Sequence, residues 1–171
     1  MDKNPFRYHW KQKEANFGPT VETEIPGGTH VSAECILKYN GKYIALRRSE
    51  AIPEHEIPEK AQKSNKACLY DVHGLPRWGE TTEQYVKRVV KDQAGVEVKS
   101  FRVADLTMGV YPETQQWYIE PTFFVEVDRL PLPGIYGNEV TEVVIFDKDN
   151  VPDDFGWWSK EQIEEFLNKY D

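Results

Sequence analysis

The sequence has few cysteines and no long apolar segment. Only two of its 171 residues are cysteines, Cys35 and Cys68, and their spacing matches no zinc motif and no disulfide framework. We expect both to be buried thiols in a reducing cytoplasm. No run of 18 apolar residues occurs, which excludes a membrane-spanning helix, and the polar first residues lack the apolar core of a secretory signal. These absences predict a cytoplasmic protein that has no membrane partner.

Basic residues are also scarce relative to acidic ones. The chain has 29 acidic and 21 basic residues, and its formal charge is −8. Such a surface repels a phosphate backbone, which argues against a nucleic-acid polymer as partner. A small phosphorylated ligand remains compatible, since a few arginines or divalent cations can hold it. The length fits one domain with a substantial core.

Alternating apolar residues predict several strands. The clearest pair is 31–39 and 42–48, because the intervening Asn40-Gly41 is a strong signal for a two-residue hairpin turn. A long polar loop, 49–66, follows, and then a short apolar run at 67–72. Further strands are predicted over 98–108, 116–127 and 139–146.

Two helices are predicted from their caps. The first covers 81–94, where Thr81 and Gln84 form a capping box and Gly95 suits a left-handed C-cap. The second starts at Ser159, with Gln162 completing its capping box. Strands with two separated helices indicate a mixed α/β domain whose sheet is covered on both faces.

The first 29 residues form a predicted N-terminal arm, and residues 30–171 the folded domain. Four aromatic residues within the arm are unusual for a solvated tail, since clusters of exposed apolar residues mark contact surfaces. They are Phe6, Tyr8, Trp10 and Phe17. We therefore expect the arm to pack on its own domain or across a homodimer.

Gln93 stands out on the first helix. At 100° per residue it falls within the apolar half, beside the stripe formed by Val86, Val90 and Ala94. A buried amide without partners costs about 1–3 kcal/mol. Two explanations stay open: the amide hydrogen-bonds a neighbouring loop, or it belongs to a functional site.

Residues 74–96 resemble the Nudix box, which reads Gly, five residues, Glu, seven residues, Arg-Glu-aliphatic-any-Glu-Glu-any-Gly-aliphatic. Six of its nine specified positions match without a gap: Gly74, Glu80, Arg88, Val90, Gly95 and Val96. The resemblance implies an α/β/α sandwich with a mixed sheet between two helices. It also implies a hydrolase of nucleoside diphosphates linked to another group.

The three mismatches fall on the positions at which the family carries metal-binding glutamates. Those positions hold Val89, Asp92 and Gln93. By resemblance, the remaining ligands of Mg²⁺ or Mn²⁺ are Gly74 through its carbonyl, Glu80, Asp92 and Gln93. Because Mg²⁺ prefers several anionic oxygen ligands, we expect a reduced affinity.

The resemblance also implies roles outside the metal ligands. Arg88 would orient the acidic cluster, with Asp92 one turn along as its partner, and Glu139 or Glu142 would act as catalytic base. Arg47, Arg48 and Trp78 would contact the substrate, the arginines through phosphate and the tryptophan by stacking on a base. Structural alternatives are open for two of these residues. Arg88 could form a surface ion pair, and Trp78 could pack in a loop or in the core.

Two functions are therefore open. The first is a metal-dependent Nudix hydrolase of weakened activity. Within it, the GDP-mannose mannosyl hydrolases are one possibility, because that subgroup also departs from the standard glutamate pattern. It is a minority possibility, because the departures are not the same. The second is a catalytically inactive Nudix-fold module that binds a nucleotide or regulates a partner.

Overall fold

The structure of the protein is a computed structural model that describes residues 29–48, 68–77, 79–112, 115–134 and 140–171. Residues 1–28 of the predicted N-terminal arm, the 49–66 loop, Trp78 and Glu139 lie outside these residues; only Thr29 of the arm is described, as the start of a strand. The homodimer inferred from the arm stays a prediction.

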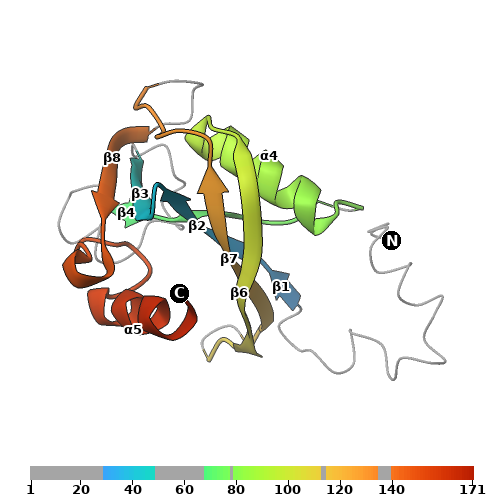
Figure 1. Cartoon of the computed structure of the whole chain (residues 1–171). Coiled ribbons are helices and arrows are strands. Elements are labelled where there is room, and N and C mark those ends of the chain that lie inside the picture. Colours follow the sequence, from blue (N-terminus) through green and yellow to red (C-terminus); the bar gives the residue numbers. More distant parts are fainter. Residues whose placement is uncertain (1–28, 49–67, 78, 113–114, 135–139) are drawn as a thin grey trace. The chain divides into compact units, whose positions relative to one another are not determined.

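The described strands form one mixed eight-stranded sheet (Figure 1). In chain order they are β1 (Thr29–Val31), β2 (Ala33–Tyr39), β3 (Lys42–Arg48), β4 (Leu69–Tyr70), β5 (Val72–Gly74), β6 (Val98–Val110), β7 (Trp117–Val127) and β8 (Val140–Phe146). The sheet runs β1-β7-β2-β3-β4, while β5 pairs with β2, β6 with β7 and β8 with β3. β2 is parallel to β7 and antiparallel to β3, so the mixed sheet predicted from the sequence is confirmed.

The predicted hairpin is present. β2 and β3 pair antiparallel, with Tyr39 opposite Lys42. The turn residues Asn40 and Gly41 both have positive φ, 49° and 77°, as a type I′ turn requires. The strand predicted over 98–108 extends to Val110, and the 67–72 run contributes to two short strands, β4 and β5.

Both predicted helices are confirmed, with their caps. α4 covers Thr82–Ala94. Its N-cap is Thr81, whose side chain accepts from the Gln84 amide, and its C-cap is Gly95, with φ 68°. α5 (Lys160–Tyr170) has the same capping box between Ser159 and Gln162. A short 3₁₀ turn, η3 (Lys148–Asn150), precedes it. Neither helix, nor any other in the described residues, has the length and apolar character needed to cross a bilayer.

The two helices cover opposite faces of the sheet (Figure 1). Alternation along β2 sends Ala33, Cys35 and Leu37 into a core with α4, which we call the α4-side core. Ile36 points the other way, into a core with Ile163 and Leu167 of α5, the α5-side core. The predicted α/β/α sandwich is therefore confirmed, and both cysteines are free and buried as expected.

The chain divides into two compact units, of which the smaller has residues 29–31, 107–112 and 115–119 as its described part. Aromatic rings from different strands contact one another in it. The ring centroids of Tyr111, in the loop after β6, and Tyr118 are 4.5 Å apart, and the Tyr111 ring also meets His30 edge to face. Tyr118 lies over Gly109, where an added Cβ would come within 2.5–2.9 Å of its phenol ring and hydroxyl. A side chain at 109 would therefore require the Tyr118 ring to move.

This overlap yields a stability prediction. Gly109→Ala forces the Tyr118 ring to move, and overpacking of this kind costs about 1–3 kcal/mol. Thermal and denaturant unfolding should show that loss. In the background of Tyr118→Ala the ring is gone, so adding Gly109→Ala should cost nothing further. An equal cost in both backgrounds would show that the ring is not the cause.

Candidate functional site

Arg88 and Glu80 connect the first turns of α4 to the loop that precedes it. Arg88 donates from Nε to Glu80 Oε1 at 2.6 Å and from Nη2 to Glu80 Oε2 at 2.8 Å, a bidentate pair. Glu80 Oε2 also accepts from the Arg77 amide at 2.8 Å. The partner predicted for Arg88, Asp92, is farther away at 3.9 Å. Arg88 thus contacts both carboxylates, but its short hydrogen bonds go to Glu80 and not to the predicted partner Asp92.

The electrostatics follow from these bonds. The hydrogen bonds from Arg88 lower the pKa of the Glu80 carboxyl to about 2. Glu80 in turn raises the pKa of the Arg88 guanidinium. The carboxylate is therefore charged at every physiological pH, and its charge is balanced within the protein.

Gln93 binds the backbone of the strand beside it. Its Oε1 accepts from the His73 amide at 3.3 Å, and its Nε2 donates to the His73 carbonyl. The side-chain amide of Gln93 thus pairs with both the amide and the carbonyl of His73. The backbone of a neighbouring β-strand would make the same two hydrogen bonds. Of the two explanations open for Gln93, these contacts match the hydrogen bond to a neighbouring loop or strand.

Val89 and Gln93 fill the space at Gly74. Val89 is 2% exposed and belongs to the α4-side core. A Cβ placed on Gly74 would lie 3.5 Å from Val89 Cγ2 and 3.9 Å from Gln93 Nε2, so both side chains face that glycine. The Gly74 carbonyl is 3.1 Å from the Tyr85 hydroxyl, which also donates to the Ala33 carbonyl at 2.7 Å.

The predicted ligand set does not fit a magnesium ion. The Glu80 carboxylate is held by Arg88, and Gln93 is held by His73. Val89 brings only methyl groups to the position nearest Gly74. That leaves Asp92, whose side chain is 56% exposed, as the one carboxylate on this part of α4, whereas Mg²⁺ requires several oxygen ligands. In the residues that the structure describes, no three His, Cys, Asp or Glu side chains come together as a metal site.

Arg47 and Glu142 lie together on the other face of the sheet. Tyr43 and Ala45 of β3 belong to the α5-side core, so alternation places Arg47 on that face, away from α4. Arg47 Nε donates to Glu142 at 2.6 Å, and its Nη2 lies 2.7 Å from Asp154. The structure thus unites a predicted substrate ligand with a predicted base, but as an ion pair separated from the box by the sheet.

The remaining predicted residues cannot be placed in the site. Arg48 ends β3 opposite Val140, at an irregularity of the strand pairing, and its side chain is outside the description. Trp78 and Glu139 lie outside the described residues, as noted above.

Sequence reasoning missed three groups. Tyr85 had no predicted role, although its hydroxyl joins β2 to Gly74. Burial raises the pKa of the Asp71 carboxyl to about 7, and burial together with Asp71 raises that of Glu34. The sequence held a signal for Glu34, a single acidic residue inside the apolar run of the first hairpin strand.

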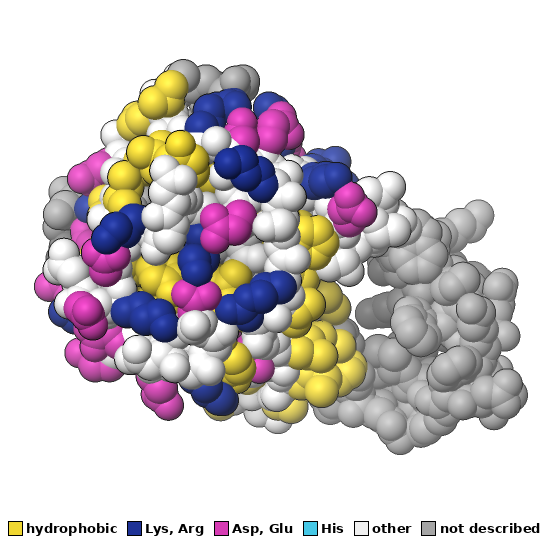
Figure 2. All heavy atoms as spheres, viewed as in Figure 1, with side chains coloured by type: hydrophobic (Ala, Val, Ile, Leu, Met, Phe, Trp, Pro, Cys, Tyr) yellow, Lys and Arg dark blue, Asp and Glu magenta, His cyan; other side chains and the backbone are white. Residues whose placement is uncertain are grey.

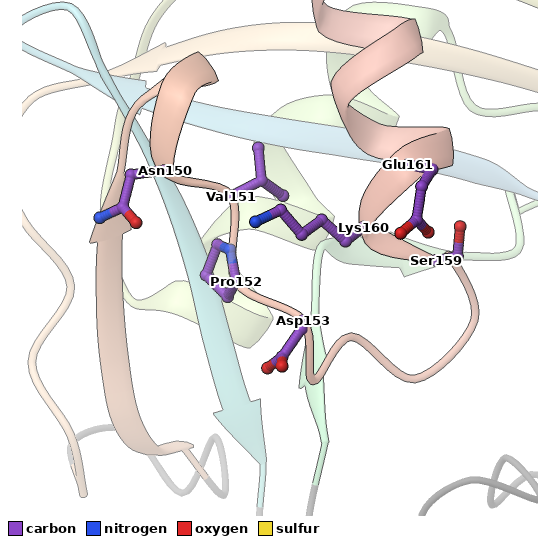
Figure 3. A pocket seen from close by; sticks show the side chains of 7 residues that line it. All are labelled: Asn150, Val151, Pro152, Asp153, Ser159, Lys160 and Glu161. Carbon is purple, nitrogen blue, oxygen red and sulfur yellow. The ribbon is translucent and has the colours of Figure 1, made fainter.

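A cavity of about 570 Å³ lies elsewhere, beside the start of α5. Figure 3 shows its lining, which comes from residues 150–153 after η3 and from residues 159–161 at the beginning of α5. No residue of the box lines it, so it does not extend the α4 site.

Comparison with known proteins identifies the fold. Neither the sequence profiles of known families nor the sequences of curated proteins match the chain. Solved structures do match: a MutT Nudix hydrolase from Burkholderia pseudomallei has a TM-score of 0.59 at 13% identity, over 84% of this chain and 98% of its own. A UDP-X diphosphatase also gives 0.59, at 12% identity, over 99% of this chain and 71% of its own.

A pyrophosphohydrolase from Bacillus subtilis gives a TM-score of 0.54 at 16% identity, over 81% of this chain and 78% of its own. At such identities the likeness concerns the fold. The chain therefore has the Nudix fold, as the resemblance implied.

The Glu80–Arg88 pair predicts how stability depends on acid. An unfolded glutamate has a pKa near 4.3. Because the folded pKa is about 2, the contribution is complete above pH 5 and is lost as the pH falls towards 2. Glu80→Gln should lower the melting temperature at pH 7 and reduce its fall between pH 5 and 2. Glu97→Gln, which breaks the exposed pair with Lys91, is the matched control. Identical acid profiles for the two variants would contradict the assignment.

Proposed function

We propose that this Nudix-fold chain is a binding module for a nucleoside diphosphate derivative, which it holds without hydrolysing it. The observation that carries the proposal is the closed set of bonds around Gly74. Glu80 is neutralised by Arg88, Gln93 is bound to His73, and Val89 is packed in the core. The groups that would have to hold a catalytic cation thus form the internal structure of the loop and helix.

Hydrolysis needs a group that activates water, either a base or a bound cation. Val89 can do neither, and the Gln93 oxygen that could bind a cation already accepts from the His73 amide. Tyr85 cannot serve as a base either, because burial raises the pKa of its phenol and its hydroxyl donates to a backbone carbonyl. These residues hold the loop in place and supply no proton transfer.

The ligand class is supported by the fold and by charge. The named structural neighbours include a UDP-X diphosphatase and a pyrophosphohydrolase, and the scaffold of glycines, caps and Arg88 at the box is intact. The net charge of −8 favours a small phosphorylated ligand over a nucleic-acid polymer.

The second candidate is hydrolysis with a weakly bound Mg²⁺ or Mn²⁺. It is favoured by the carboxylate of Asp92, whose side chain is 56% exposed, and by the hydrolase names of the structural neighbours. The GDP-sugar glycosyl hydrolases are one form of this candidate. This candidate requires at least one carboxylate to leave the ion pair described above and to bind the cation or accept a proton from water.

A panel of nucleoside diphosphate derivatives separates the two candidates. We expect at least one compound to raise the melting temperature to the same extent with Mg²⁺ and with EDTA, because no cation takes part in binding. We expect no release of phosphate, nucleotide or sugar. Product release that requires Mg²⁺ or Mn²⁺ would establish the hydrolase and overturn the proposal.

Placing carboxylates at Val89 and Gln93 tests whether these two residues are the reason that the predicted ligands do not fit Mg²⁺. In Val89→Glu with Gln93→Glu, two new carboxylates face Gly74 near Asp92, and they repel one another when no cation is present. The variant should be less stable than the parent and should regain melting temperature as Mg²⁺ is added, whereas the parent should not respond.

The matched control adds two carboxylates on exposed positions of the same helix, Thr82→Glu with Lys87→Glu. It should respond to Mg²⁺ no more than the parent does. A Mg²⁺ response in the parent as large as that of the restored variant would show that the native residues already form a site.

A further inference from the structure

Four adjacent strands place two cations and two aromatic rings on the face covered by α5. In the order of pairing, β6 contributes Arg102, β7 Phe124, β2 Lys38 and β3 Tyr43. Lys38 and Tyr43 are direct partners in the β2–β3 register. Phe124 and Tyr43 belong to the α5-side core, so the group lies on the opposite face of the sheet from α4 and the box.

These side chains converge on one carboxylate, that of Asp171, the residue that caps α5. Lys38 Nζ lies 2.8 Å from Oδ1 and 2.7 Å from Oδ2. Arg102 Nη2 lies 3.1 Å from Oδ1, and the Tyr43 hydroxyl donates to Oδ2. Every polar side chain of the group therefore donates to the same acceptor.

The aromatic rings hold both cations in place. Lys38 Nζ is 5.1 Å from the Tyr43 ring centre and 5.5 Å from that of Phe124, and the Arg102 guanidinium carbon is 4.5 Å above Phe124. Cation–π attraction acts at such distances, and it does not depend on Asp171. The positions of the donors are thus supported by the sheet itself.

The donors and exposures suit an exchangeable anion. Two cations and one hydroxyl donate to the Asp171 carboxylate, while Glu126, the β7 partner of Lys38 in the strand register, lies on the same face of the sheet. Lys38 is only 14% exposed, but Arg102 is 51% exposed and opens the group to solvent. Around the end of α5, the surface shows Lys and Arg side chains beside acidic ones (Figure 2). Nearby Asp147 is paired with Lys42, at 2.6 Å.

We propose that Lys38, Tyr43 and Arg102 form an anion site whose internal occupant is the Asp171 carboxylate, and that a phosphate group competes with Asp171 for it. A phosphate dianion carries more negative charge than the Asp171 carboxylate and offers more acceptor oxygens to the three donors. It cannot share the site with the end of α5, because Arg102 Nη2 also binds the Tyr170 carbonyl at 2.7 Å and the helix end carries partial negative charge. Binding would therefore release the last turn of α5. The proposal is independent of the ligand proposed for the box.

Inorganic phosphate is the probe, titrated with ionic strength kept constant by chloride. Asp171→Asn removes the competing charge and keeps the side-chain size. This variant should be less stable than the parent without phosphate, and its melting temperature should rise more steeply as phosphate is added. Adding Arg102→Gln to it should abolish the steeper rise. Asp147→Asn frees one lysine, Lys42, without a second cation or a hydroxyl, and is the matched control; it should respond as the parent does.

The parent gives a second measurement that requires no variant. The Asp171 amide bonds to the Leu167 carbonyl at 3.1 Å, so release of the last turn exposes that amide. Phosphate should speed its hydrogen exchange, while amides in the middle of α4 should not change. Equal phosphate responses of the parent, Asp171→Asn and the double variant would overturn the proposal, and so would an unchanged exchange rate at the end of α5.

Discussion

The bidentate pair between Arg88 and Glu80 is the constraint on which the box region depends. It joins the loop after β5 to the helix that follows, while the same carboxylate also accepts from the Arg77 amide. With the loop held there, α4 presents Val89 and Gln93 to Gly74, and both side chains become part of the packing. The Glu80 carboxylate, bound in this way, stabilises the loop and the helix and is less available to bind a cation. Under the proposed function, the Nudix scaffold persists while these side chains form bonds within the protein.

Much of the fold could be predicted because its determinants are local. Both capping boxes, the left-handed glycine at 95 and the Asn40-Gly41 turn depend on residues within a few positions of one another. The strands β6, β7 and β8 were found from alternation to within a few residues. The order of the strands and the parallel pairing of β2 with β7 were not predicted, since sequence periodicity carries no information about which strands meet.

The site was harder to predict, because it depends on contacts between distant residues. Helical spacing suggested Asp92 as the partner of Arg88, whereas the loop brings Glu80 closer. Arg47 was assigned to the site by the family resemblance, since it stands near the end of the second hairpin strand. Its face depends on the register with the core, and that face is the one away from α4. The wheel position of Gln93 did show that it needs a partner, but the identity of that partner, His73, required the structure.

The parallel contact between β2 and β7 has a consequence for how the chain folds. The register joins Glu34 to Thr122 and Lys38 to Glu126, so the centre of the sheet forms only when segments far apart in sequence meet. The loop-closure entropy of such contacts is lost before their packing is gained, and this slows folding. The β2–β3 hairpin and α4 can form early from local contacts. During synthesis, both would present their apolar faces to water until β7 has emerged, and in that interval the chain is most exposed to aggregation.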